Sequence, residues 1–152
     1  MISTASLARF TVSVARLAER SGRGSRGLRR AAVAGGATAS LATSALCWLA
    51  LSGRWGKDDD SATALARWAF VAGGPVHGVG FGVLTGVLAL AGLRTSELPR
   101  PVAITGLVSA ASGLLSPLYF VWEPAGGLIP AGRFSGLLVS GIAGARLSRR
   151  SG

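Results

Sequence analysis

The sequence predicts an all-α, polytopic membrane protein, a bundle of four transmembrane helices with both chain ends in the cytoplasm. Three observations predict this class: long uncharged apolar stretches, basic residues crowded near the chain ends, and tryptophans gathered at one membrane face. Of the 152 residues, 49% are hydrophobic and only 14% are charged, and the mean hydropathy is +0.49. A bilayer selects such long uncharged stretches because a charge at the hydrocarbon centre is costly.

Four segments have spanning length: residues 31–51, 68–92, 101–121 and 128–147. A helix needs about 20 mostly apolar residues to cross a bilayer core of roughly 30 Å. The first three segments contain no Lys, Arg, Asp or Glu. We expect the fourth to begin near Pro130, because proline suits the first helical turn, with Arg133 reaching the head groups from that turn. A re-entrant segment is the alternative for this fourth stretch.

The basic residues indicate the orientation of the spans. Seven precede the first span, two lie in the loop 93–100 and three lie at the C-terminal end (Arg146, Arg149 and Arg150), whereas four lie on the opposite side: Arg54, Lys57, Arg67 and Arg133. Cytoplasmic flanks carry the excess of Lys and Arg, so both termini are predicted to be cytoplasmic. The tryptophans agree, because all four fall at the predicted outer interface: Trp48, Trp55, Trp68 and Trp122.

This organisation divides the chain into a basic cytoplasmic tail (1–30), a transmembrane domain (31–147) and a short basic tail (148–152). Apolar residues recur at helical spacing in the first tail: Leu7, Phe10, Val14 and Leu17. They predict an amphipathic helix lying on anionic lipid, which would be a partner of this tail. A disordered tail and an Arg-rich transit peptide are the alternatives.

Small residues four positions apart form two ladders. They are Gly74, Gly78, Gly82 and Gly86 in the second span and Gly132, Gly136, Ser140 and Gly144 in the fourth. Residues at this spacing lie on nearly one helix face and allow two backbones to approach closely. We interpret the ladders as packing within one bundle, with a homo-oligomer or a membrane partner as the alternative.

A candidate polar site lies toward the predicted outer half of the membrane: His77, Tyr119, Glu123 and Arg133. Pro75 and Pro117 interrupt two spans nearby, and each frees a backbone carbonyl that then needs a polar partner. An ionisable group within a span indicates function, so His77 is a candidate proton acceptor or head-group ligand. The structural alternative is that His77 bonds a neighbouring helix and that Glu123 pairs with Arg133 or with lipid.

Several chemistries are excluded by residue counts. Cys47 is the only cysteine and His77 the only histidine, which excludes dithiol exchange and haem held by two histidines within one chain. The chain lacks the residues that a closed zinc site needs, and it contains no phosphate-binding glycine loop. We therefore expect no metal and no cofactor. The net charge of +10 follows the predicted topology rather than forming a nucleic-acid motif, so nucleic acid is not an expected partner.

The sequence therefore favours a non-enzymatic accessory or helix-packing partner protein in a cell membrane. The Arg-, Ala- and Gly-rich composition is typical of GC-rich bacterial genomes and favours a bacterial plasma membrane. One alternative is a small-solute or lipid transporter, permease-like, with its site around His77. A second alternative is an intramembrane lipid-modifying enzyme that uses Glu123 or His77 as a base.

Overall fold

The computed structural model describes the backbone of residues 2–22, 24–52 and 59–150, and their side chains except at 2, 3, 52, 59 and 147–150. Arg54, Trp55 and Lys57, which entered the orientation prediction, lie outside these residues. The helices are α1 (Ile2–Arg20), α2 (Ser25–Ser52), α3 (Asp59–Val71), α4 (His77–Arg94), α5 (Arg100–Leu115) and α6 (Leu128–Arg150). The fold is all-α, and four helical stretches are long and apolar enough to cross a membrane.

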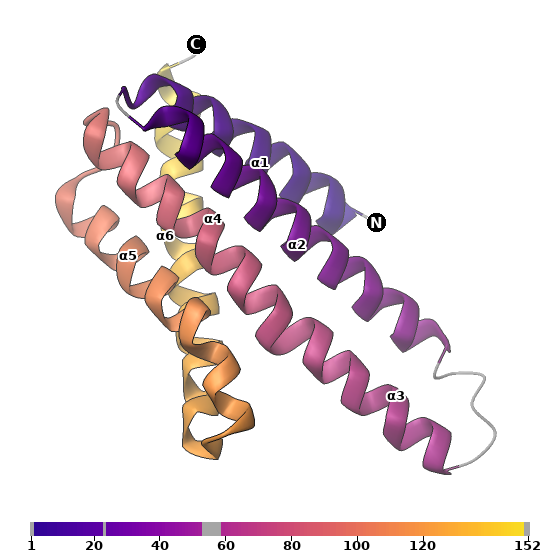
Figure 1. Cartoon of the computed structure of the whole chain (residues 1–152). Coiled ribbons are helices and arrows are strands. Elements are labelled where there is room, and N and C mark those ends of the chain that lie inside the picture. Colours follow the sequence, from indigo (N-terminus) through magenta and orange to yellow (C-terminus); the bar gives the residue numbers. More distant parts are fainter. Residues whose placement is uncertain (1, 23, 53–58, 151–152) are drawn as a thin grey trace.

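Helix α4 is the centre of the bundle, because it contacts α1, α2, α5 and α6. Helix α2 runs beside the continuous rod formed by α3 and α4, and α1 folds back antiparallel to α2 (Figure 1). On the other side α5 packs against α4, and α6 packs against both. The main hydrophobic core joins all five helices of the bundle; its members include Leu17 of α1, Ala32 of α2, Leu84 of α4, Ala103 of α5 and Val139 of α6.

Helix α1 is a fifth member of the bundle, which differs from the expectation of a tail lying on lipid. Its apolar stripe is buried against protein, with Val14 and Leu17 only 1% and 4% exposed. The turn into α2 uses Gly22 and Gly24 at φ of 81° and 79°, a region that glycine adopts without strain. The physical reason for the difference is that α1 contacts α2 and α4, so its apolar stripe is removed from water by burial against protein.

The second apolar stretch is one continuous helical rod rather than a helix broken at Pro75. It includes a π-helical turn at Ala72–Val76, which accommodates the proline inside the helix. The rod from Asp60 to Arg94 has 35 residues. At 1.5 Å per residue it is about 52 Å long, well beyond a hydrocarbon core of about 30 Å. Its α3 end therefore extends past any bilayer that α4 crosses at an ordinary tilt of up to about 40°.

The third and fourth spans are joined by two short 3₁₀ helices, Ser116–Phe120 and Glu123–Gly127. The first of them begins beside Pro117, where α5 ends. Helix α6 then has 23 residues without interruption, which is about 34 Å and enough for a full crossing. Because α6 begins at Leu128, Pro130 lies in its first turn as expected, but Arg133 lies one turn further in than predicted.

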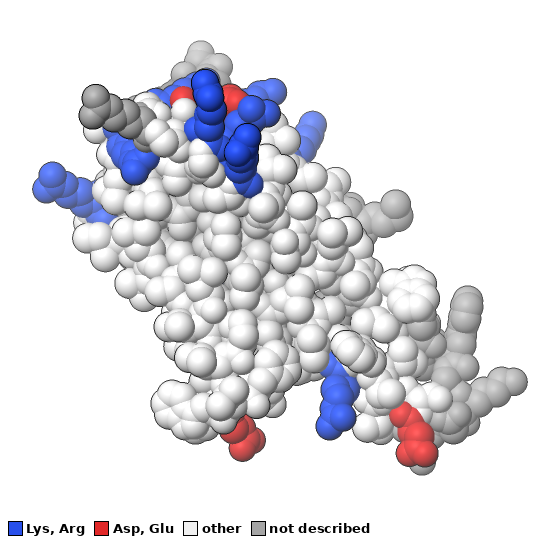
Figure 2. Space-filling model, viewed as in Figure 1, with Lys and Arg blue, Asp and Glu red and all other residues white. Residues whose placement is uncertain are grey.

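Charged residues are unevenly placed on the surface. Figure 2 shows Lys and Arg gathered at the end where α1 meets α2 and α4 meets α5, while the broad middle of the visible face is uncharged. The basic residues near these connections include Arg20, Arg26, Arg94 and Arg100. An uncharged belt with a basic end is the surface expected of a protein embedded in a bilayer.

Candidate functional site

His77 begins α4 and reaches toward α2. Its Nδ1 lies 3.2 Å from the carbonyl oxygen of Ala39 and 3.2 Å from Oγ1 of Thr43. Thr43 Oγ1 itself donates to the same Ala39 carbonyl at 2.9 Å. A carbonyl only accepts, so its bond with His77 requires the proton on Nδ1. The other ring nitrogen, Nε2, has no hydrogen-bond partner among the described residues and is left as an acceptor.

A groove beside His77 opens between α1, α2, α4 and α6, with a volume of about 390 Å³. We call it the His77–Arg133 groove; its lining is Ser6, Leu7, Phe10, Thr43, His77, Phe81, Arg133 and Leu137. The imidazole of His77 stacks on Phe81, with ring centroids 5.8 Å apart and planes 11° apart, which holds the ring in place. The groove therefore combines a fixed histidine, one guanidinium and an apolar wall.

A second hollow containing His77 and Arg133 lies deeper, between α4, α5 and α6. It has a volume of only about 10 Å³, which is the room of about one water molecule. Gly78, Gly82 and Gly113 line it, so the close approach of the helices fills the space that the proline positions led us to expect there. Any ligand larger than water must therefore use the His77–Arg133 groove on the α1 side.

Tyr119 and Glu123, the other two predicted site residues, line neither hollow. Tyr119 packs on Phe70 of α3 and on Phe120, with ring centroids 5.3 Å and 6.0 Å apart. Glu123 is exposed at the start of the second 3₁₀ helix. Among the described residues no ion pair joins Glu123 to Arg133. The structure brings together His77 and Arg133 only.

The glycine ladders lie mostly between helices of the bundle. A Cβ at Gly82 would meet the Ala110 carbonyl at 3.0 Å, and one at Gly132 would meet the Gly113 nitrogen at 3.1 Å. Contacts of 3.1 Å or less would also arise at Gly78, Gly86 and Gly136, whereas Gly74 has ordinary contacts. The hydroxyl of Ser140 is buried without a partner among the described residues. A Cβ at Gly144 would meet nothing within 4 Å.

Ser116 supplies the polar partner that the Pro117 interruption requires. The Gly113 carbonyl, which loses its usual helical donor at Pro117, accepts from the backbone N–H of Ser116 and also from its Oγ at 2.7 Å. The same hydroxyl lies 3.4 Å from the Pro75 carbonyl in the neighbouring rod. Ser116 is fully buried. One side chain thus links the two proline positions, Pro75 in the π-helical turn before α4 and Pro117 in the first 3₁₀ helix after α5.

Ser116→Ala is expected to lower the stability of the folded protein by about 1 kcal/mol, the usual contribution of one hydrogen bond. Thermal unfolding in detergent micelles measures the change as a lower melting temperature. Ser135→Ala is the matched control, because Ser135 donates within its own helix to Ala131 at 2.6 Å in exposed surroundings. Equal melting temperatures for the two variants would mean that the Ser116 hydroxyl does not support the interruption.

Sequence reasoning missed the α1 and α2 contributions to the groove. Thr43 is one uncharged polar residue among several in a Ser- and Thr-rich span, so no local signal distinguishes it. The basic tail predicted over residues 1–30 contains Ser6, Leu7 and Phe10, which line the groove. Their spacing signals a helix, but only the packing of α1 places that helix beside His77.

Comparisons with known protein families, characterised proteins and solved structures found no match for this chain. Any function must therefore be inferred from the chemistry of the residues themselves. Among the described residues no group of three or more His, Cys, Asp or Glu side chains is arranged to hold a metal ion. Cys47 is exposed on α2.

Proposed function

We propose that this chain is a non-enzymatic multi-pass membrane protein that binds an amphiphile in the His77–Arg133 groove by the anionic head group of that amphiphile. The observation that carries the proposal is Arg133. Its guanidinium has no ion pair or hydrogen bond among the described residues, and it lines the same groove as His77. An unpaired cation beside apolar side chains in a membrane is costly, and a bound anion removes that cost.

The chemistry of the lining favours a phosphate-type head group. A guanidinium binds phosphate oxygens through two parallel hydrogen bonds. The free Nε2 of His77 accepts a hydrogen bond, so it suits a head group that also carries a hydroxyl, as a phosphate monoester does. The apolar wall of Leu7, Phe10 and Leu137 suits the hydrocarbon tail of the same molecule.

The test uses dodecyl phosphate and dodecanol, two probes with the same tail and different heads. The full chain is placed in nanodiscs of phosphatidylcholine, and its melting temperature is followed as each probe is added. Dodecyl phosphate is expected to raise the melting temperature saturably, because a ligand that binds only the folded state stabilises it. Dodecanol is expected to have no such effect.

Arg133→Gln is expected to abolish the rise, whereas Arg67→Gln is expected to retain it. Arg67 is an exposed arginine of α3 that lines neither hollow, so its variant controls for the loss of one positive charge. An equal rise with dodecanol, or a full rise in Arg133→Gln, would overturn the proposal.

The proposal differs from the alternatives in what each requires. Helix-packing with a partner would use the glycine ladders, yet most of their close contacts are with other helices of this chain. A lipid-modifying enzyme would use Glu123 or His77 as its base; Glu123 lines neither hollow, so this alternative would need His77 as the base. Transport by a permease-like module would begin with binding in this groove, so the same Arg133 variant tests its first step.

A further inference from the structure

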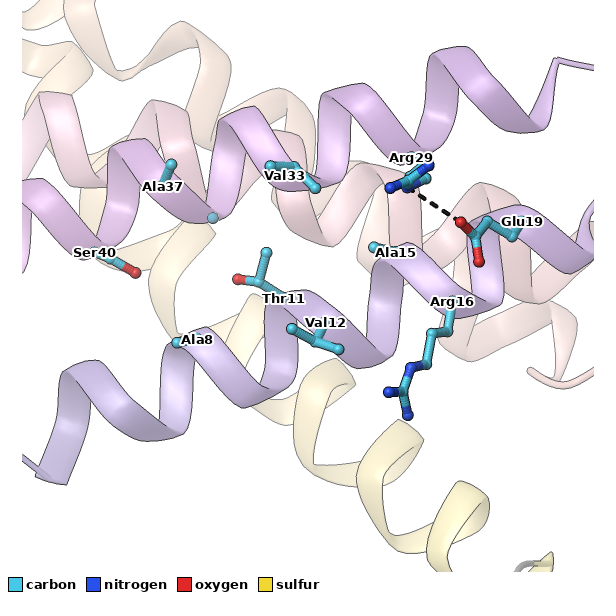
Figure 3. A pocket seen from close by; sticks show the side chains of 11 residues that line it. Ala8, Thr11, Val12, Ala15, Arg16, Glu19, Arg29, Val33, Ala37 and Ser40 are labelled. Atoms are coloured by element: carbon cyan, nitrogen blue, oxygen red, sulfur yellow. Dashed lines mark ion pairs between the residues drawn. The ribbon is translucent and has the colours of Figure 1, made fainter.

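A second groove runs between α1 and α2, on a different face of α1 from the His77–Arg133 groove. Its volume is about 480 Å³, and it shares no lining residue with the first groove. Figure 3 shows Ala8, Val12 and Ala15 along α1 facing the row of Val33, Ala37 and Ser40 along α2. We call this the α1–α2 groove.

The α1–α2 groove is mainly apolar along its length, where Thr11 and Ser40 add two hydroxyls, and it is charged at one end. Glu19 and Arg29 close that end with an ion pair of 3.1 Å, drawn as a dashed line in Figure 3. Arg16 lies at the same end, and its side chain extends away from α2. The Arg16 guanidinium has no ion pair among the described residues. One end charged and the rest mainly apolar is the polarity of a lipid molecule.

The outward face of α1 continues the α1–α2 groove and adds a second arginine beside it. Arg9, Ser13 and Arg16 are exposed and line an adjoining hollow with Ala8 and Val12. This polar stripe lies beside α2, one of the four helices with the length and hydropathy of a span. Bare hydrocarbon against two arginines is strongly unfavourable, so an anionic group must lie between them and the acyl chains.

From these observations we infer that the α1–α2 groove binds one anionic phospholipid. Its acyl chain lies along Val12, Val33 and Ala37, and its phosphate is held by Arg16 at the charged end. The volume is ample, because a cavity of about 150 Å³ already accepts benzene. The positive charge selects an anionic lipid over a zwitterionic one. This site goes beyond the proposed function, since none of its residues belongs to the His77–Arg133 groove.

The experiment is native mass spectrometry of the full chain released from nanodiscs that contain phosphatidylcholine and phosphatidylglycerol with identical acyl chains. Wild type is expected to retain one phosphatidylglycerol. Arg16→Gln is expected to reduce that adduct about fivefold, the effect of one basic residue near a lipid phosphate. Ala37→Leu is expected to reduce it as well, because the larger side chain fills the groove without changing charge. Arg67→Gln is expected to leave it unchanged.

Four outcomes would overturn the inference. Equal retention of the two lipids would remove the charge selectivity, and an unchanged adduct in Ala37→Leu would place the lipid outside the groove. Loss of the adduct in Arg133→Gln, with retention in Arg16→Gln, would assign the lipid to the other groove and leave the proposed function standing. Displacement of the lipid by a co-purified acidic membrane protein would count against a lipid as the natural occupant.

Discussion

Gly82→Leu is expected to separate α4 from α5 and to destabilise the protein by about 3 kcal/mol or more, the upper range for overpacking. The three atoms nearest a Cβ at this position are all backbone: the Ala110 carbonyl oxygen at 3.0 Å, the Gly113 Cα at 3.2 Å and the Leu114 nitrogen at 3.3 Å. Backbone atoms cannot rotate away as a side chain can. The two helices must therefore move apart, and α4 loses its most extensive contact.

The measurement is the melting temperature and the monodispersity of the purified protein in detergent. Gly144→Leu is the matched control, since it belongs to the same kind of ladder but faces open space. Gly78→Leu is expected to act in the same direction as Gly82→Leu, because Ser116 Oγ would lie 3.0 Å from its Cβ. If Gly82→Leu and Gly144→Leu had the same melting temperature, the α4–α5 contact would not be as close as described.

Leu17→Asp is expected to release α1 from the bundle while α2, α4, α5 and α6 stay together. Leu17 is 4% exposed and belongs to the core cluster that includes Leu84 and Leu88 of α4. An ionised carboxylate in that apolar position costs several kcal/mol, because no partner replaces its hydration. The turn at Gly22 and Gly24 then allows α1 to leave as one unit.

Trypsin digestion of the solubilised protein reports this release, since α1 carries Arg9, Arg16 and Arg20. Cleavage within α1 is expected to accelerate about tenfold for every 1.4 kcal/mol by which docking is weakened. Val12→Asp is the control on the same helix, because Val12 is 50% exposed. Equal cleavage rates for the two variants would show that α1 is not held by its Val14–Leu17 face.

Part of the candidate site could be predicted from residue type alone. His77 and Arg133 could be singled out because an ionisable group in an apolar stretch is rare for energetic reasons. Their association with Thr43 and Phe10 could not be predicted, because those residues are ordinary in their own segments. Tyr119 and Glu123 share the same sequence neighbourhood, yet the two short 3₁₀ helices place them outside both hollows that contain His77.

The all-α class and the four apolar helices could be predicted from the amino-acid sequence alone. These depend on local quantities, the length and hydropathy of each segment, and a helix forms its backbone hydrogen bonds within that same segment. Local quantities also indicated the helical periodicity of residues 7–17. They did not determine which surface that helix would cover.

The direction in which each helix face points depends on the packing of the helices against one another. Tertiary structure placed α1 on α2 and α4, and it carried the second helix through Pro75 by a π-helical turn. Gly80, which belongs to neither predicted ladder, also lies at the contact with α2. A Cβ there would meet the Ala39 nitrogen at 2.7 Å and the Gly35 carbonyl at 2.8 Å. The physical reason is that helix contacts depend on the shapes of two surfaces at once, and spacing along one segment describes only one of them.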